Sequence, residues 1–182
     1  INILIRLIHK YEINNAIKKF PDYRKKYDIT KLKLKCIKVK ARWSASNLVL
    51  NFDEKSVSEI KKNNFDLIYF SGSGIIRGEI LNSTKIGVIS LHHADNRFMR
   101  GKHSGFWEVL KNKPTTGFII QKLNNNLDAG EIIMRGNIRT ANYWLTNNAR
   151  ILHKSLIFTK NVFNNFALSK QIDLKKYDQS YT

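Results

Sequence analysis

The chain has 182 residues, of which 42% are hydrophobic and 25% are charged. This balance is typical of a folded globular domain and excludes a disordered or fibrous protein. The length suits one domain over residues 1–182, with a substantial core, and is short for two domains. No apolar run approaches the ~20 residues of a membrane span, so we expect no membrane partner.

The single cysteine excludes an internal disulfide and favours a reducing compartment, so we expect a cytoplasmic protein. The net charge is +18, which permits a basic nucleic-acid-binding module. The lysines are scattered, however, and no basic run is interleaved with aromatic residues. A lysine-rich surface is therefore the simpler interpretation, and the charge also suits an anionic substrate.

The first quarter of the chain predicts one helix and one strand. Residues 1–20 carry apolar side chains at roughly helical spacing, and Pro21 ends this helix. Over residues 32–39, apolar side chains alternate with lysines, which predicts a strand with Cys36 as a small core residue. Residues 43–52 are expected to form an irregular linker.

The next elements alternate between helix and strand. Asp53 is a favourable N-cap for a helix that runs to about Asn63. Residues 66–70 and 87–91 are short apolar runs and predict buried strands. A second helix is predicted between them over residues 75–81.

The second half predicts a helix over residues 104–110, strands over 116–123 and 131–134, and a polar loop over 124–130. The chain then forms a long helix over about 142–169. The predicted buried stripe of that helix comprises Ile151, Leu152, Leu156, Phe163 and Phe166.

The element order predicts an α/β fold: a Rossmann-like open, mostly parallel sheet with flanking helices. The two later strands are expected to add an antiparallel or mixed edge. The usual first strand and turn of such a fold are not visible at the start of the sequence, so we expect the sequence to be N-terminally truncated.

A polar cluster follows the strand over residues 87–91. Ser90 and His92 are two positions apart, so their side chains point the same way at the end of that strand. The loop that follows carries many polar and charged side chains, namely His93, Asp95, Asn96, Arg97 and Arg100. Such crowding at the carboxyl end of a strand predicts a functional site.

Two other site chemistries can be weighed in the same segments. Adjacent histidines on a strand point to opposite faces, so His92 and His93 are poorly placed to share a metal ion, and we predict none. Residues 72–78 read G-x-G-x-x-x-G, one residue longer than the dinucleotide fingerprint. A tight turn, or a backbone edge offered to a planar ligand, is the better interpretation.

Four short motifs, taken in order, resemble those of the folate-dependent formyltransferases. They are Ser90-Leu91-His92, Arg100-Gly101, Thr116-Gly117 and Asp128-Ala129-Gly130. The similarity covers about residues 57–138. In the family pattern the first motif is Asn-x-His, and this chain has Ser90 in place of that Asn.

The resemblance implies transfer of a formyl group from 10-formyltetrahydrofolate to an amine. His92 is then the oxyanion donor or general acid, and Asp128 orients it and accepts a proton. His93 and Asn96 are candidates to replace the missing Asn beside Ser90. The residues implied for the folate are Gly74, Ile75, Ile76, Asn126, Leu127 and Asp128. Those implied for the substrate are His93, Asp95, Asn96 and Arg100.

The preferred acceptor is an amino sugar, nucleotide-linked or within a polysaccharide. Methionyl-tRNA and glycinamide ribonucleotide are the alternatives within the family, with tRNA the weaker because the chain shows no C-terminal RNA-binding domain. From other classes, a catalytically degenerate formyltransferase fold, a nucleic-acid-binding module and a metal hydrolase stay open.

Overall fold

The computed structural model describes residues 3–99, 103–126, 130–169 and 171–172. This part of the chain divides into two compact units. Unit 1 contains Ile1–Asp28, His92–Ile119 and Arg135–Ile172, and unit 2 contains Ile29–Leu91 and Ile120–Met134. Strands β5, β6 and β7 contribute residues to both units.

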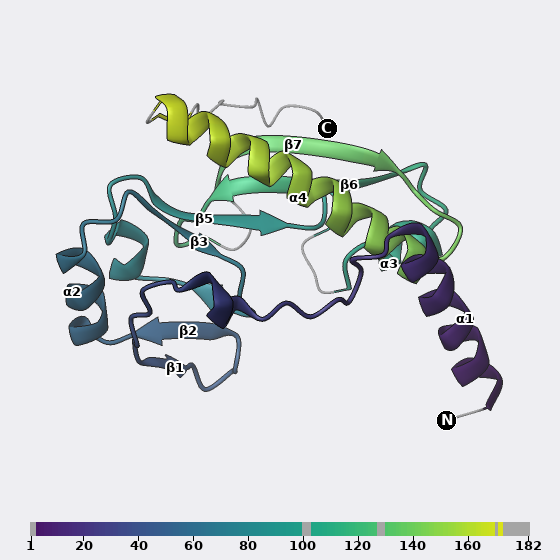
Figure 1. Cartoon of the computed structure of the whole chain (residues 1–182), viewed down its shortest axis with the longest axis horizontal. Helices are drawn as coiled ribbons and strands as arrows, with labels where there is room; N and C mark the ends of the chain where they lie inside the picture. Colours follow the sequence, from purple (N-terminus) through teal and green to yellow (C-terminus); the bar gives the residue numbers. More distant parts are fainter. Residues whose placement is uncertain (1–2, 100–102, 127–129, 170, 173–182) are drawn as a thin grey trace. The chain divides into compact units, whose positions relative to one another are not determined.

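The elements follow one another along the chain as Figure 1 labels them. They are α1 (Ile3–Lys19), η1 (Ile29–Leu32), β1 (Ala41–Trp43), β2 (Val49–Phe52), α2 (Glu54–Lys62), β3 (Leu67–Phe70), β4 (Ile75–Ile76), η2 (Glu79–Asn82), β5 (Gly87–His92), α3 (Phe106–Leu110), β6 (Thr115–Lys122), β7 (Glu131–Arg139) and α4 (Trp144–Ser169).

The strands form two sheets of mixed direction. One has the order β3-β5-β6-β7, with β3 and β5 parallel and Phe70 paired with Ser90. Within unit 1, β6 and β7 run in opposite directions (Figure 1). In the other sheet, β2 pairs antiparallel with β1 and parallel with β4. The predicted α/β fold with flanking helices and a mixed edge is confirmed.

The core of unit 2 forms where α2 packs on the sheets. Val57 and Ile60 of α2 cluster with Ile80, Leu81 and Val88. The Asp53 carboxylate accepts a hydrogen bond from the Ser56 amide (2.8 Å), which caps the helix, and Asn63 ends it. The predicted start and end of this helix are confirmed.

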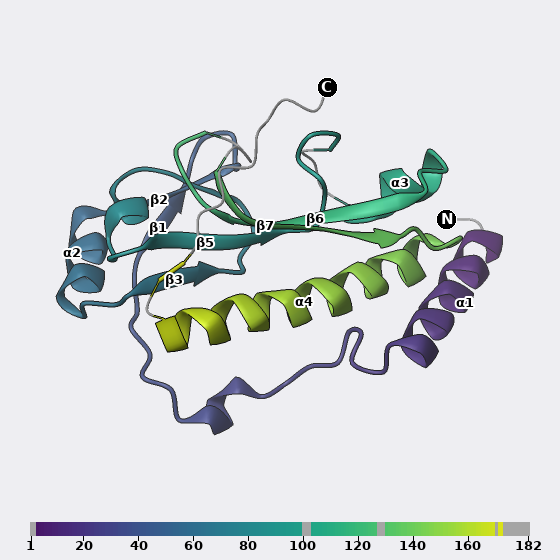
Figure 2. The ribbon, with the colours of Figure 1, turned by 90° about the horizontal axis from the view of Figure 1, so that it is seen from above.

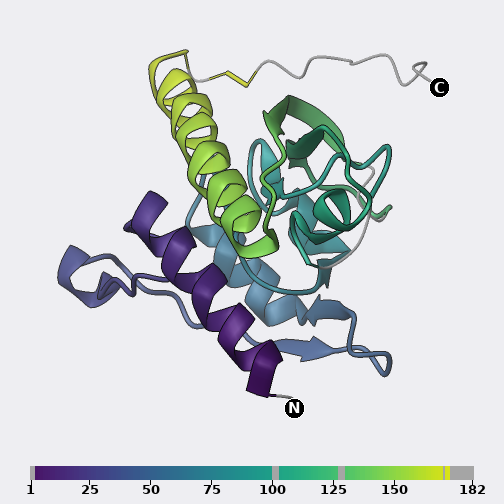
Figure 3. The same ribbon diagram turned by 90° about the vertical axis from the view of Figure 1, so that its right-hand side faces the viewer.

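Unit 1 is built around α4. This helix lies along one face of β6 and β7 (Figure 2), where the rings of Phe118 and Phe158 are 5.6 Å apart. Helix α1 crosses α4 near its N-terminal end (Figure 3), and Ala16 packs against Leu145 and Ala149 there. Glu12 of α1 accepts a hydrogen bond from the Leu145 amide (3.0 Å), so α1 also caps α4.

Helix α1 confirms the first predicted helix. Few of its apolar side chains are buried. At about 100° per residue, Leu4, Leu7 and Ile8 lie roughly opposite Ile13 and Ala16 around the helix axis. The second group faces α4, and Ala16 is the one buried residue of the helix. Leu4, Leu7 and Ile8 are therefore exposed.

Two predictions between α1 and α2 are wrong. Residues 33–40 form no strand, because none of the described segments pairs with them, and Cys36 is exposed rather than in a core. The expected linker over residues 43–52 is instead a hairpin of β1 and β2. Its turn depends on Ser44, whose hydroxyl accepts from the Val49 amide, and on Asn47 at a φ of 54°.

Two further predictions failed where tertiary packing outweighed local pattern. The predicted helix over 75–81 is the short strand β4 followed by η2, because Ile75 and Ile76 pair with β2 and Gly78 adopts a φ of 83°. Leu156, expected in the buried stripe of α4, is exposed, while Ser155 and Thr159 are buried.

Candidate functional site

Strand β5 carries the two residues on which the sequence prediction centred. Ser90 and His92 lie at its carboxyl end, and both are half-buried. Parallel pairing with β3 fixes this end of the strand through the Phe70–Ser90 register. The strand therefore brings His92 to the start of the polar loop, as predicted.

His93 follows as a half-buried histidine that stays neutral near pH 7. Burial, and secondarily the charge of His92, lower its pKa from 6.5 to about 4. Its Nε2 atom is buried and has no hydrogen-bond partner within the described ranges. A neutral imidazole with an uncommitted nitrogen can donate or accept a hydrogen bond without changing charge.

Glu108 of α3 is a carboxylate near His92 that the sequence analysis did not single out. Burial raises the pKa of the Glu108 carboxyl, while its own backbone amide and the charge of His92 oppose the rise. The opposing effect of His92 indicates that the two side chains interact electrostatically.

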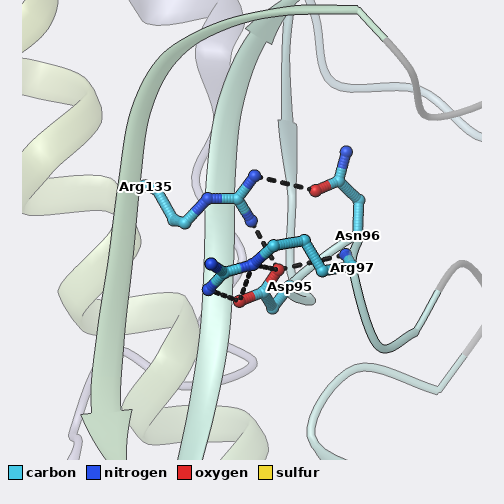
Figure 4. Close-up of polar contacts among 4 residues, drawn as sticks. All are labelled: Asp95, Asn96, Arg97 and Arg135. Carbon is cyan, nitrogen blue, oxygen red and sulfur yellow. Dashed lines mark hydrogen bonds and ion pairs between the residues drawn. The ribbon is translucent and has the colours of Figure 1, made fainter. Parts of the chain in front are cut away.

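The loop after β5 forms the cluster shown in Figure 4, which we call the arginine cluster: Asp95, Asn96, Arg97 and Arg135. The Arg97 side chain holds the Asp95 carboxylate through Nε (3.0 and 3.1 Å) and Nη2 (2.6 Å). Arg135 of β7 donates from Nη1 to the same carboxylate and from Nη2 to the Asn96 amide oxygen (3.0 Å).

The Asp95 carboxylate stays ionised in this environment. Burial alone would raise the pKa of Asp95, but hydrogen bonds from Arg97 and the charges of Arg135 and Arg97 together lower it below the usual 3.8. The sequence analysis missed Arg135. The available signal was a lone arginine directly after the apolar run Ile132-Ile133-Met134 of a strand.

The Thr116-Gly117 motif links this cluster to α4. A Cβ atom on Gly117 would lie 2.6 Å from the Asp95 Cβ, so only glycine allows the loop to approach β6 so closely. The hydroxyl of Thr116, one position earlier, accepts a hydrogen bond from the Asn147 amide nitrogen of α4 (2.8 Å) and shares one with the Thr140 hydroxyl (3.0 Å). Successive residues of a strand face opposite sides, so the motif serves both faces of β6.

Asn147 is fully buried and joins three segments of unit 1. Its amide nitrogen donates to the Gly105 carbonyl (2.9 Å) and to Thr116, and its amide oxygen accepts from the Ala141 amide (3.0 Å). We call these contacts the Asn147 network. The sequence analysis did not single out Asn147, because an Asn inside a helix carries no local pattern.

Residues close in sequence to the two predicted folate segments contact each other in unit 2. The Gly78 amide donates to the side chain of Asn125 (3.1 Å), which connects the end of β4 to the loop before β7. Gly74 adopts a φ of 97°, a conformation that favours glycine. A cavity of about 560 Å³ opens beside this connection, with Phe52, Val57, Lys61, Arg77, Gly78 and Ile80 among its lining residues.

Three predicted site residues, Arg100, Leu127 and Asp128, lie outside the described residues. The pairing of Asp128 with His92 therefore stays a prediction. In the ranges that are described, no three metal-ligating side chains gather at one point. No helix there combines the length and apolar composition needed to cross a membrane.

Neither protein-family models nor curated protein sequences match the chain. Solved structures do. A sugar N-formyltransferase from Shewanella sp. matches 97% of this chain and 71% of its own, with a TM-score of 0.60 and 18% identity. The formyltransferase PseJ from Anoxybacillus kamchatkensis, in complex with UDP-4,6-dideoxy-4-formamido-L-AltNAc and tetrahydrofolate, matches 72% of this chain and 70% of its own (TM-score 0.54, 23% identity).

Glycinamide ribonucleotide transformylase 1 from Symbiobacterium toebii matches 62% of this chain, with a TM-score of 0.52 and 13% identity. The match covers 58% of that protein, so the chain spans less than two thirds of its length. At these identities the likeness establishes architecture. The chain has the Rossmann-like α/β fold of the formyltransferases.

Proposed function

We propose that the protein transfers a formyl group from a folate donor to an amine. The observation that carries the proposal is the location of His92, which ends β5 in a chain with the formyltransferase fold. Open α/β folds bind their ligands at the carboxyl ends of the sheet strands, and His92 lies at such an end.

In the proposed reaction the amine attacks the formyl carbon and an oxyanion develops on the formyl oxygen. His92 donates a hydrogen bond to that oxygen, and Asp128 accepts the proton that the amine loses. The bond from the formyl carbon to the folate nitrogen then breaks, and the folate nitrogen takes up a proton. The products are the formamide and tetrahydrofolate.

Ser90 stands where the family pattern has an Asn that donates to the oxyanion. His93 and Asn96 are the two candidates to replace that donor. The Asn96 amide oxygen accepts from Arg135, which fixes the orientation of its amide. His93 is neutral and has an uncommitted buried nitrogen, so it can donate without a net charge.

The residues proposed for the folate suit a planar, hydrogen-bonding ring system. Gly74, Ile75 and Ile76 offer backbone groups, and the positive φ of Gly74 turns that backbone sharply. The contact between Gly78 and Asn125 brings this segment to the loop that carries Asn126. The proposed donor is 10-formyltetrahydrofolate.

An amino sugar linked to a nucleotide is the proposed acceptor. Two of the matched structures support this choice: one is a sugar N-formyltransferase, and the other contains a UDP-linked formamido sugar with tetrahydrofolate. Glycinamide ribonucleotide is the second candidate, supported by the transformylase match.

A transfer assay tests the proposal. The full chain is incubated with 10-formyltetrahydrofolate and a panel of UDP-amino sugars, glycinamide ribonucleotide and methionyl-tRNA, and tetrahydrofolate release is measured. We expect turnover with a sugar amine, and a loss of about 10²–10³ in kcat in His92→Ala, the usual effect of removing an oxyanion donor. His9→Ala, which changes an exposed histidine of α1, is the matched control.

Tetrahydrofolate release that is equal in wild type and His92→Ala would contradict the assigned role of His92. Absence of release with every acceptor would contradict the proposed function. Salt-sensitive nucleic-acid binding in that case would favour the binding-module alternative.

A further inference from the structure

The N-terminal half of α1 exposes large apolar side chains on one side of the helix. Ile3 is 76% exposed, Leu7 58%, Tyr11 57% and Ile8 50%. At about 100° per residue, these four side chains lie within roughly 140° of the helix circumference. We call them the α1 apolar face. Contiguous apolar side chains of this kind mark an interaction surface, whereas single exposed ones are found on any protein.

The packing of unit 1 uses the other side of this helix. Ile13 and Ala16 meet Leu145 and Ala149 of α4, and Figure 3 shows α1 crossing α4 there. Helix α1 therefore has two apolar sides, one that is turned to α4 and one that faces solvent. Because the first already anchors the helix to unit 1, the α1 apolar face is available for a partner without any change in the fold.

Cations accompany the α1 apolar face. Arg6 and Lys10 lie one turn apart along one edge of the face, and both are exposed. Lys18 and Lys19 add two positive charges in the last turn. The one acidic residue of α1, Glu12, is turned to α4, where its carboxylate accepts a hydrogen bond from the backbone (3.0 Å). The charges that α1 presents to solvent are thus positive.

We infer that α1 docks on the surface of an anionic lipid bilayer, with the α1 apolar face among the headgroups and Arg6 and Lys10 beside the phosphates. Helices that carry cations next to an apolar face bind in this orientation, parallel to the membrane plane. Anionic lipids supply the complementary charge, and each nearby Lys or Arg strengthens binding by roughly fivefold. The expectation of no membrane partner concerned a spanning helix, whereas a helix on a surface buries only one face.

A second copy of the chain is the weaker candidate for this surface. In a two-fold dimer the same patch of both subunits forms the interface, so the cations of two α1 helices would be brought together. The net charge of +18 on each copy adds to that repulsion, but it steers the protein toward an anionic surface. Charge complementarity therefore favours the lipid bilayer.

Co-sedimentation of the full chain with lipid vesicles at fixed ionic strength tests the inference. Phosphatidylcholine vesicles with added phosphatidylserine should bind the protein at least about tenfold more tightly than pure phosphatidylcholine, because only the former carry a negative surface. Arg6→Gln combined with Lys10→Gln should weaken this binding roughly 25-fold, at about fivefold for each cation. Leu7→Gln combined with Ile8→Gln should weaken it at least about tenfold, since less apolar surface is buried in the bilayer.

Each double variant has a matched control. Lys55→Gln with Lys62→Gln removes two exposed charges from α2 of unit 2. Leu156→Gln with Ile157→Gln replaces two exposed apolar side chains of α4. Neither control should change vesicle binding by more than about twofold, because these side chains lie away from the lipid and salt screens distant charges. Circular dichroism checks that every variant folds.

Equal binding to both kinds of vesicle, or binding to neither, would overturn the inference. So would equal losses in the α1 variants and their controls, since binding would then reflect total charge or general hydrophobicity. Sedimentation velocity without lipid tests the second copy: a dimer that dissociates in Leu7→Gln with Ile8→Gln would assign the α1 apolar face to self-association and overturn the lipid assignment. These outcomes do not depend on formyl transfer, which is assayed without lipid.

Discussion

Two buried polar clusters of unit 1 flank the same strand and differ in almost every physical respect. Thr116 of β6 contacts the Asn147 network, and Gly117, the next residue, makes room for the arginine cluster. The Asn147 network is neutral and joins backbone and side-chain groups of three segments. The arginine cluster is charged and extends from a buried carboxylate to a partly exposed guanidinium.

The two clusters differ in charge and in exposure to solvent. The three contacts of Asn147 satisfy groups that would otherwise be buried without partners, so the network stabilises the fold. In the arginine cluster the Arg97 side chain is 36% exposed, so the ion pairs with Asp95 extend from the core to the surface. Substitutions in the two clusters should therefore change the free energy of unfolding and its pH dependence to different extents.

The largest loss of stability is expected from Asp95→Asn. This change leaves Arg135, whose side chain is mostly buried, without its carboxylate, and breaking a buried charge pair costs about 3–5 kcal/mol. Urea denaturation measures the free energy of unfolding. A loss below about 1 kcal/mol would mean that the cluster is solvated and not built as described.

Asn147→Ala should follow, with a loss on the order of 3 kcal/mol. The Gly105 carbonyl and the Ala141 amide would lose their partners, at about 1–3 kcal/mol for each buried group. The same denaturation measurement applies. A loss below about 1 kcal/mol would argue against a structural role for the network.

Acid pH should lower the free energy of unfolding through His93 and Asp95. The lowered pKa of His93 means that the unfolded state takes up a proton below pH 6.5, whereas the folded state does so only near pH 4. Stability should therefore fall by about 2 kcal/mol between pH 6.5 and 5, and fall further below that. Asp95, whose pKa is also lowered, contributes stability above pH 3.8 that is lost as the pH falls through its folded pKa.

Denaturation curves across this pH range check the prediction. His93→Gln should flatten the dependence between pH 6.5 and 5, whereas His9→Gln, which changes an exposed residue, should leave it unchanged. Equal slopes in His93→Gln and wild type would show that His93 titrates normally.

Gly117→Ala should cost on the order of 1–2 kcal/mol. The added methyl group would lie 2.6 Å from the Asp95 Cβ and 3.0 Å from the Asn137 side-chain oxygen, so the loop must shift. Calorimetric melting measures the change. An unchanged melting temperature would contradict the close approach.

The smallest effect is expected at Leu156 of α4, which lies outside both clusters. Leu156 is 55% exposed, so Leu156→Gln should change the free energy of unfolding by less than about 0.5 kcal/mol. A loss above 2 kcal/mol would restore the sequence-based assignment of this residue to the buried stripe.

Local sequence patterns correctly predicted the elements that depend on capping and on hydrophobic periodicity. The cap formed by Asp53, the buried strand that ends at His92 and the long helix α4 all follow from capping and periodicity. The hairpin of β1 and β2 was missed because short strands resemble linkers until their pairing is known. The expected strand around Cys36 failed because alternation alone supplies no partner.

The site could be predicted in part for the same reason. The polar residues from Ser90 to Arg97 lie in one short stretch, interrupted by Leu91 and Ala94, so their concentration is visible in the sequence. Arg135 is distant along the chain, and only the approach of β7 to the loop brings it to Asp95. Asn147 is equally distant from Gly105 and Thr116, which it joins.

Folate binding is the most direct test of the account. A stable analogue of 10-formyltetrahydrofolate is titrated into the full chain while thermal stability is followed. At 100 times the dissociation constant, a ligand that binds the folded state should add about 2.7 kcal/mol, and His92→Ala should retain most of that gain. An unchanged melting temperature at saturating analogue would contradict folate-dependent formyl transfer.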